Sequence, residues 1–443
     1  MYVCREPDEQ QLELFERSMP FADKLDRTNR WICLAHAIDW RELEVSYAKL
    51  FADTGRPALR ARYVVGTLIL KHQFEFSDED IVQFIIECPY LQYFIGLAKF
   101  TTSAPFETSS LSRVRERLGE KTFQEFEQTL IATLVAQKVI KPKSLQIDAT
   151  VFESDITYPT DCGLLEKARR FCVKQIQQFS HVVKTKVRTY SRTAKKQYLN
   201  FAKKKHKTKK QIRRMQKTLL QYVRRNLRQF SELMAQAQTR GHEVADKIIE
   251  TFETVKEIYA QQKEMYKEKK KAIAHRIVSL TKPYVRPIVR GKSGKDVEFG
   301  AKVQVSYIDG YLFLDALSFD NFNESTRLEA SVESYQRRFA KLPEEVLMDQ
   351  IYGTHDNRKY LREKGIRTSV KKLGRPSLDE ASASEARWRK RKQRERNRIE
   401  GAIGNSKTCY DLGIVRARTP RTESSWIQMA LFSRNLMLAA KRI

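Results

Sequence analysis

Hydrophobic positions in the first 140 residues recur at helical spacing. The amphipathic segment WRELEVSYAKLF and the apolar run in ARYVVGTLILKHQFEF predict helices, and strand patterns are few in this part of the chain. Ser77 precedes DEDIVQFIIE as an N-cap with acids in the first turn, and Pro89 marks the end of that helix. We therefore expect an all-helical N-terminal domain over residues 1–140.

A short basic helix follows a second capping sequence in this part. The hydroxyl residues at 108–110 precede LSRVRERLG, which ends at Gly119. Such a helix, after a capped helix and a turn, is typical of the reading element of a helix-turn-helix module. The spacing fits equally a solvated helix face, or a helix packed on another domain with its arginines snorkelling. The candidate DNA contacts are Arg113, Arg115 and Arg117.

Residues 163–288 keep the helical pattern but are far more polar. Apolar residues fall three and four positions apart from Ile212 to Leu233, and a second stripe runs from Val244 to Tyr266. The two stripes predict an inserted α-helical hairpin whose arms bury their apolar faces on each other.

After this insertion the period changes from helix to strand. AKVQVSYIDGYLFLDALSF alternates apolar and polar residues around an Asp-Gly pair that is typical of a tight hairpin turn. With a strand at LQIDATV, the order is strand, insertion, hairpin, helix, strand, helix, strand and helix, which resembles an RNase H-like fold. The fold class is thus mixed, or α+β, with an RNase H-like α/β domain over residues 141–162 and 289–443.

The charge of the chain adds a partner to this picture. Its 443 residues include 83 Lys and Arg against 54 Asp and Glu, which gives a formal net charge of +29. No acidic residue occurs from Phe171 through Phe230, so the excess is clustered. Phosphate binding with counterion release explains such a field better than general solubility does. Candidate DNA contacts in the insertion are Lys203, Lys204, Lys205, Arg213, Arg214, Arg224 and Arg225.

The cysteines and apolar runs bound the cellular location. The six cysteines form no CxxC pair and no regular spacing, so neither a zinc site nor a disulfide framework is expected. No apolar run approaches the roughly 18 residues that a membrane span needs. We expect a protein of the reducing cytoplasm without a membrane partner.

Acidic residues stand where the predicted strands should be apolar. Asp148 lies within LQIDATV, and Asp349 directly follows the apolar residues 346–348. A buried carboxylate is costly unless something compensates it, and a bound divalent cation does so. The first and fourth strands of an RNase H-like sheet are neighbours, so these two acids can meet. Glu400, on the last basic helix, can reach back to the same place.

Three oxygen donors suit Mg²⁺ or Mn²⁺ rather than Zn²⁺. Two such ions about 3.5 to 4 Å apart support an in-line displacement at phosphorus, the chemistry by which DNA strands are cut and joined. Three acids among 54 fit a structural or surface role as well.

Blocks along nearly the whole chain are similar to one family. GRPALRARYVVGTLILKHQFEF and APFETSSLSRVRERLG in the N-terminal part, LQIDATVFESDITYPTDCGLL, and DQIYGTHDNRKYL resemble the DDE transposases of bacterial insertion sequences. The resemblance is to the group named for the fifth insertion sequence.

The last block carries a more specific motif. Transposases of the wider superfamily have Y-x2-R-x3-E-x6-K around the catalytic glutamate, and Arg396, Glu400 and Lys407 match that spacing. Gln393 stands at the tyrosine position, so the role of that tyrosine is absent or supplied elsewhere. The resemblance implies that Arg396 and Lys407 contact DNA phosphates beside the scissile bond.

The resemblance implies that Asp148, Asp349 and Glu400 are the catalytic residues and that they hold two Mg²⁺ or Mn²⁺ ions. The enzyme would bind terminal inverted repeats, cleave the element ends and join the 3′-hydroxyls to target DNA. We expect a homodimer or higher assembly on DNA, in the bacterial cytoplasm and associated with the nucleoid. The alternatives are an RNase H-like nuclease without strand transfer and a domesticated or inactive DNA-binding protein.

Overall fold

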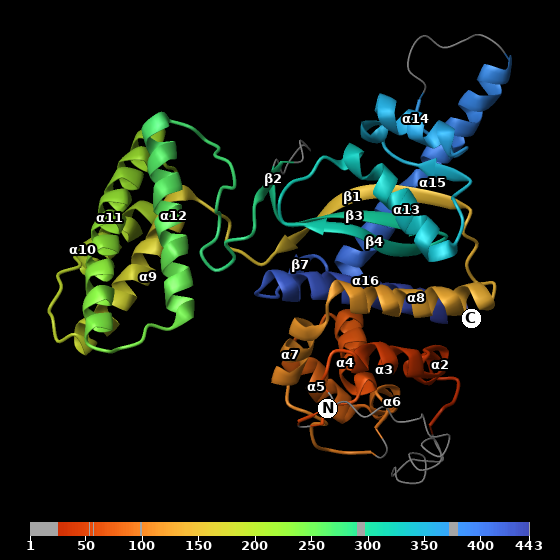
Figure 1. The fold of residues 1–443 in the computed structure, drawn as a ribbon, viewed down its shortest axis with the longest axis horizontal. Helices are drawn as coiled ribbons and strands as arrows, with labels where there is room; N and C mark the ends of the chain where they lie inside the picture. Colours follow the sequence, from red (N-terminus) through yellow and green to blue (C-terminus); the bar gives the residue numbers. More distant parts are fainter. Residues whose placement is uncertain are drawn as a thin grey trace. The chain divides into compact units, whose positions relative to one another are not determined.

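The chain forms two compact units in the computed structural model. Unit 1 comprises residues 1–155 and 301–443, and unit 2 comprises residues 156–300. The chain combines runs of helices with a sheet in a mixed α and β architecture, as the sequence predicts (Figure 1). The structure describes residues 25–52, 54–55, 57–97, 100–289, 297–371 and 380–442.

Helices fill the N-terminal part of unit 1, and local signals set their ends. Ser77 Oγ accepts a hydrogen bond of 3.0 Å from the amide of Asp80, which caps α5 as predicted. Trp31 and Trp40 each pack edge to face on Phe94, so aromatic rings form much of the core here. The helices are α2 Arg30–Ala37, α3 Trp40–Ala48, α4 Ala61–Phe74, α5 Asp78–Glu87, α6 Pro89–Phe94, α7 Ser109–Arg117 and α8 Glu120–Ala136.

A mixed sheet forms the other part of unit 1. The strand order is β4-β3-β1-β5-β6, in which β3 and β4 form the predicted hairpin and β1, β5 and β6 are parallel. Ser144 of β1 lies opposite Glu345 of β5, which confirms that the first and fourth strands of this sheet are neighbours. The strands are β1 Ser144–Ser154, β3 Val297–Ile308, β4 Tyr311–Ser318, β5 Glu345–Leu347, β6 Arg367–Thr368 and β7 Ile414–Val415.

Helices cover both faces of this sheet (Figure 1). Tyr335 of α13 belongs to the core that contains Phe313, while Ile399 of α15 and Ile427 of α16 belong to the core that contains Val303. The sheet is therefore buried on both sides, as its parallel strands β1, β5 and β6 require. The elements are η2 Glu324–Arg327, α13 Leu328–Phe339, η3 Gln350–Tyr352, α14 His355–Glu363, α15 Glu380–Cys409 and α16 Pro420–Ala440.

Helix α16 lies beyond the last helix that the sequence pattern predicts. It packs on β4 and also on α4, α7 and α8, so nearly all of its residues are buried. Its buried residues include polar ones such as Glu423, Gln428 and Asn435, so the apolar residues form no single stripe for periodicity to detect. Its start was readable, because Thr419 caps it and Pro420 opens it. Among the described residues, α16 included, no helix has the length and apolar character to cross a membrane.

Unit 2 is built mainly from helices. Phe230 of α11 packs edge to face on Phe252 of α12, with 4.7 Å between the ring centroids. Phe179 of α9 packs on the same Phe230 at 5.4 Å, so α9 and α12 together cover the apolar stripe of α11. The insertion therefore contains more than the two-helix pair of the sequence pattern. Its elements are α9 Asp161–Val182, α10 Ser191–Ala202, α11 Lys209–Thr239, α12 Asp246–Glu268 and β2 Pro287–Val289.

Candidate active site

The register of two strands brings two of the predicted acids to the same level of the sheet. β1 and β5 pair in parallel as far as Gln146 and Leu347, and Asp148 and Asp349 each lie two residues further on. Asp148 is still within β1, whereas Asp349 follows β5 and caps η3 by accepting a 2.6 Å hydrogen bond from the amide of Gln350. The two carboxylates thus come from adjacent strands.

An arginine links the third predicted acid to the first. Arg396 Nη2 donates to Glu400 Oε1 at 2.8 Å, and Arg396 Nη1 lies 3.8 Å from Asp148 Oδ2. Arg396 and Glu400 belong to α15, which packs on β1 and β5. The Glu400 side chain is 55% exposed, while that of Arg396 is 10% exposed. The structure therefore brings Asp148, Arg396 and Glu400 together.

The surroundings of Asp148 disfavour the charged form of its carboxyl group. Burial raises its pKa to about 6, although Arg396 acts in the opposite direction and the amide of Ala149 donates a hydrogen bond to it. The charges of Glu324 and Glu400 add to the rise. An additional cation beside Asp148 would stabilise the charged form of this carboxyl group.

The sequence did not predict the polar side chains around Asp148. Glu324, at the start of η2, forms a 3.0 Å ion pair with Lys302 of β3. Tyr352 is fully buried and donates a 2.9 Å hydrogen bond to Gln304 Oε1. Burial raises the pKa of Tyr352 well above its ordinary value, and the charges of Glu324 and Asp148 raise it further. The sequence did contain a signal of this polar group, because Lys302 and Gln304 are polar residues within the largely apolar strand β3.

The donor atoms of this group are of the chemical type that the metal implied by the sequence prefers. Asp148, Asp349 and Glu400 offer carboxylate oxygens, which Mg²⁺ and Mn²⁺ prefer. Across the part of the chain that the structure describes, no group of three or more His, Cys, Asp or Glu side chains is arranged to hold a metal ion. Arg396 instead contacts both Asp148 and Glu400.

Lys407 lies further along α15, on the side that faces β1. Its Nζ is 5.7 Å from the ring centroid of Phe152 in β1. Arg396 and Lys407, the two basic residues of the motif, therefore both lie on the helix beside the strand that carries Asp148.

The basic helix α7 differs from the expectation at one position. Arg115 is buried, donates to both carboxylate oxygens of Asp78, and lies 5.6 Å from the ring centroid of Trp426. Its side chain is used inside unit 1, which corrects the expectation of a DNA contact. Arg113 and Arg117, on the same helix, are exposed.

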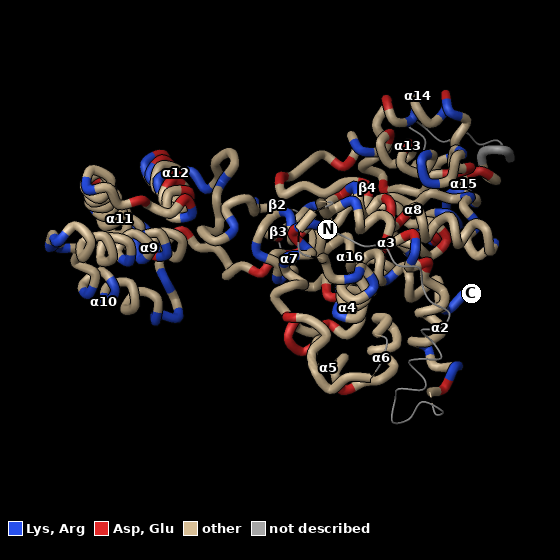
Figure 2. Tube along the Cα trace, turned by 60° about the horizontal axis from the view of Figure 1, so that its bottom comes forward, with Lys and Arg blue, Asp and Glu red and all other residues tan. Residues whose placement is uncertain are grey.

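The predicted basic residues of the insertion lie on and between two helices of unit 2. Lysines and arginines follow one another along α10 and α11 (Figure 2). Lys203, Lys204 and Lys205 follow α10 and are exposed, as are Arg214 and Arg224 on α11. Arg213 and Arg225 are half-buried against the rings of Tyr266 and Tyr190.

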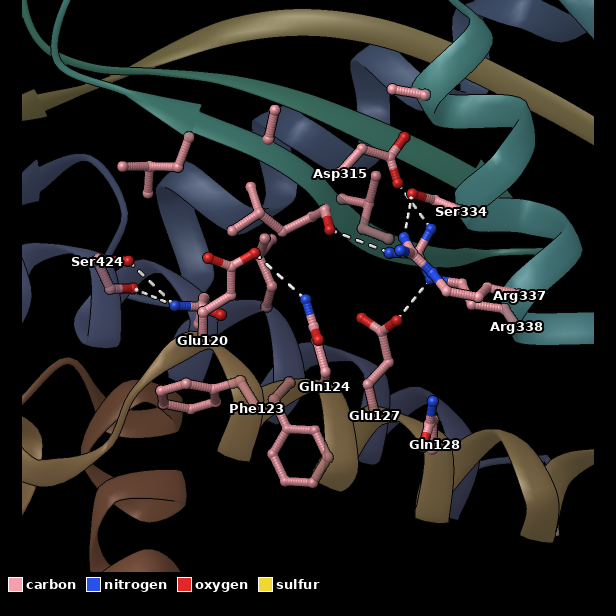
Figure 3. A pocket seen from close by; sticks show the side chains of 18 of the residues that line it. Glu120, Phe123, Gln124, Glu127, Gln128, Asp315, Ser334, Arg337, Arg338 and Ser424 are labelled. Carbon is pink, nitrogen blue, oxygen red and sulfur yellow. Dashed lines mark hydrogen bonds and ion pairs between the residues drawn. The ribbon is translucent and has the colours of Figure 1, made fainter. Parts of the chain in front are cut away.

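A cavity of about 510 Å³ lies elsewhere in unit 1, between α8, β4, α13 and α16 (Figure 3). Arg338 spans its wall, 2.5 Å from Glu127 and 2.6 Å from Asp315. None of the three predicted acids lines this cavity. It is therefore separate from the chemistry that the sequence predicts.

Comparisons with known proteins point in one direction. Residues 19–117 match the family described as Transposase domain (DUF772), and residues 346–437 match the family described as Transposase DDE domain. "Uncharacterized protein ORF8 in nfe locus" of Rhizobium meliloti is 30% identical over 183 residues, which are 40% of this chain and 87% of that protein. No solved structure matches the chain significantly. The second match includes Asp349 and Glu400.

Proposed function

Because the chain belongs to the DDE transposases of bacterial insertion sequences, we propose that it binds the terminal inverted repeats of its element, cleaves the element ends and joins the 3′-hydroxyls to target DNA. A DDE domain implies an RNase H-like fold and a metal-dependent enzyme that cuts and joins DNA. The observation that carries the proposal is that Arg396 contacts both Asp148 and Glu400. Asp148 lies on β1, and Asp349 follows β5, the strand that pairs with β1.

In this proposal Asp148, Asp349 and Glu400 are the residues that would hold two divalent ions. Bound ions supply activation of the attacking hydroxyl and stabilisation of the leaving oxygen. Arg396 transfers its hydrogen bond from Glu400 to a phosphate oxygen of the DNA, which frees the Glu400 carboxylate. Lys407 binds a neighbouring phosphate. Binding of DNA by Arg396 thus allows Glu400 to act together with Asp148 and Asp349.

The other parts of the chain position the DNA. We assign recognition of the inverted repeats to the helical domain of residues 1–140, with Arg113 and Arg117 as contacts. The insertion of residues 163–288 serves as a DNA clamp, and residues 141–162 and 289–443 form the catalytic domain. Since two element ends must be held together, the active species is a homodimer or higher assembly on DNA.

Removal of the acids tests this function. Asp148→Asn, Asp349→Asn and Glu400→Gln should each abolish Mg²⁺-dependent cleavage of DNA that carries the flanking inverted repeats, while binding of that DNA persists. An amide keeps the size of the side chain but loses the charge that holds the cation. Near-normal cleavage by any one variant removes that residue from the site.

A control and a second product define the reaction. Asp356 is a fully exposed acid seven residues after Asp349, and Asp356→Asn should cleave normally. Joined products between element ends and target DNA distinguish a transposase from a nuclease of the same fold, which produces cleaved ends only.

A further inference from the structure

A groove with a basic lining lies on unit 2. Gln221, Arg224, Arg225 and Arg228 of α11 line a cavity of about 530 Å³. Arg224 and Arg228 are four positions apart and both exposed, and like charges at this spacing destabilise a helix. Glu232 compensates Arg228 in part, with 3.5 Å between Glu232 Oε1 and Arg228 Nε. An anion in the groove would compensate the remaining positive charge.

Tyr190 holds arginines from two separate segments beside this groove. The guanidinium carbons of Arg188 and Arg225 lie 4.6 and 4.7 Å from the centroid of its ring. Gln229 of α11 donates a 3.1 Å hydrogen bond to the carbonyl oxygen of Arg188, which ties the segment before α10 to α11. Cation–π contacts of this kind fix flexible side chains in place. Arg188 therefore joins the arginines of α11 in one preorganised set.

The backbone at Tyr190 reinforces this arrangement. Its φ is 55°, in the left-handed region that a bulky residue rarely adopts. Tyr190 precedes α10 directly, so the unusual conformation also sets the direction in which that helix starts. The fold thus keeps the aromatic ring at the arginines despite an unfavourable backbone.

We infer that Arg188, Arg224, Arg225 and Arg228 form a cradle for successive phosphates along one DNA backbone. The inference rests on the proposed function and gives the clamp of unit 2 its specific contact surface. Arginine offers planar, forked donors that match phosphate oxygens, and it stays charged at any physiological pH. The stretch from Phe171 through Phe230 contains no carboxylate, and Arg228 of this set forms an ion pair with Glu232, in which the two exposed side chains are 3.5 Å apart.

Contact through this cradle is independent of base sequence. The Tyr190 ring is already engaged by two guanidinium groups, so binding comes from charge rather than from stacking on bases. The cradle should therefore strengthen binding to inverted-repeat DNA and to random DNA equally.

The test is the salt dependence of DNA binding by the full-length protein. Each lost phosphate contact on duplex DNA lowers the slope of log affinity against log salt by about 0.9, so Arg188, Arg224, Arg225 and Arg228 changed together to Gln should lower it by about 2 to 4. Four exposed lysines of α12 provide the control, because their change to Gln removes the same charge and should leave the slope unchanged. These lysines are Lys247, Lys256, Lys263 and Lys267.

Two further variants keep the result interpretable. Changing the four arginines to Lys retains the charge, and should retain most of the slope while weakening affinity. Changing only Arg224 and Arg228 to Gln affects two exposed side chains and should lower the slope by about 1 to 2. A normal slope in the four-Gln variant, or an equal fall in the α12 control, overturns the cradle. If Asp148→Asn still abolishes cleavage in that case, the proposed function stands without it.

Discussion

Arginines of the two units occur in contrasting environments. In unit 1, Arg115 is buried against Asp78, and the Lys71–Asp411 ion pair of 2.8 Å leaves 2% and 5% of the two side chains exposed. In unit 2, Arg224 is exposed on a helix whose apolar stripe already packs on α9 and α12. A basic helix is therefore no evidence of a DNA surface until the partners of its arginines are known.

The buried charges of unit 1 join its N-terminal helices to its C-terminal helix. Lys71 Nζ of α4 lies 3.6 Å from the ring centroid of Trp426 in α16, and Trp426 Nε1 donates a 2.9 Å hydrogen bond to the carbonyl oxygen of Asp411. Burial lowers the pKa of Lys71, and the charge of Asp411 opposes that shift. Charge in this unit therefore stabilises contacts between distant segments of the chain.

The largest difference between the two kinds of arginine should appear in stability. Arg115→Ala leaves Asp78 without its partner, and removal of one member of a buried pair costs about 3 to 5 kcal/mol. Arg224→Ala should change stability by less than about 0.5 kcal/mol, because its side chain is exposed. Urea unfolding followed by circular dichroism measures both. Equal stability of the two variants would break the comparison.

Asp148 should show the cost of buried charge through pH. Its pKa rises from 3.8 to about 6 on folding, so the folded chain binds more protons than the unfolded chain between these values. Stability therefore falls as the pH rises through this window. Asp148→Asn escapes the cost, and should gain up to about 3 kcal/mol over the wild type between pH 4 and pH 7.5, at about 1.4 kcal/mol per pKa unit.

Thermal unfolding in metal-free buffer at both pH values measures this gain. Asp356→Asn serves as the control, because Asp356 is fully exposed. A gain for Asp148→Asn that is the same at pH 4 and pH 7.5 would mean that Asp148 carries no charge-burial cost.

The exposed arginines of α7 should have a smaller effect, confined to DNA recognition. Arg113→Gln and Arg117→Gln together should weaken binding to inverted-repeat DNA by about 1 to 3 kcal/mol, and binding to random DNA by less, if the side chains reach base edges. Competition binding with the two DNAs measures the difference. An equal loss for both DNAs would reduce these residues to phosphate contacts, like those proposed for the cradle of unit 2.

Features with local signals were predictable from the sequence. The cap at Ser77 and the hairpin turn at Asp309 and Gly310 follow from neighbouring residues alone. The adjacency of Asp148 and Asp349 followed from the likeness of the element order to an RNase H-like fold, in which the first and fourth strands are neighbours.

Other features depend on partners that lie far away in the sequence. Arg115 pairs with Asp78, 37 positions earlier, and nothing near Arg115 reveals it. Glu324 has the local pattern of a helix start, and only the folded chain brings its charge near Asp148. Helix α16 is buried by the sheet and by helices from distant parts of the chain, and its buried residues include polar ones. Such features need tertiary contacts, which hydrophobic periodicity does not contain.

The assignment of the active site to Asp148 is tested most directly by metal binding in the absence of cleavage. Mn²⁺ is titrated into the full-length protein with bound inverted-repeat DNA that already ends at the cleavage site, and free Mn²⁺ is followed by electron paramagnetic resonance. The wild type and Asp356→Asn should bind two ions. Asp148→Asn should lose at least one of them or bind at least about tenfold more weakly. Binding by Asp148→Asn with wild-type stoichiometry and affinity would contradict the account.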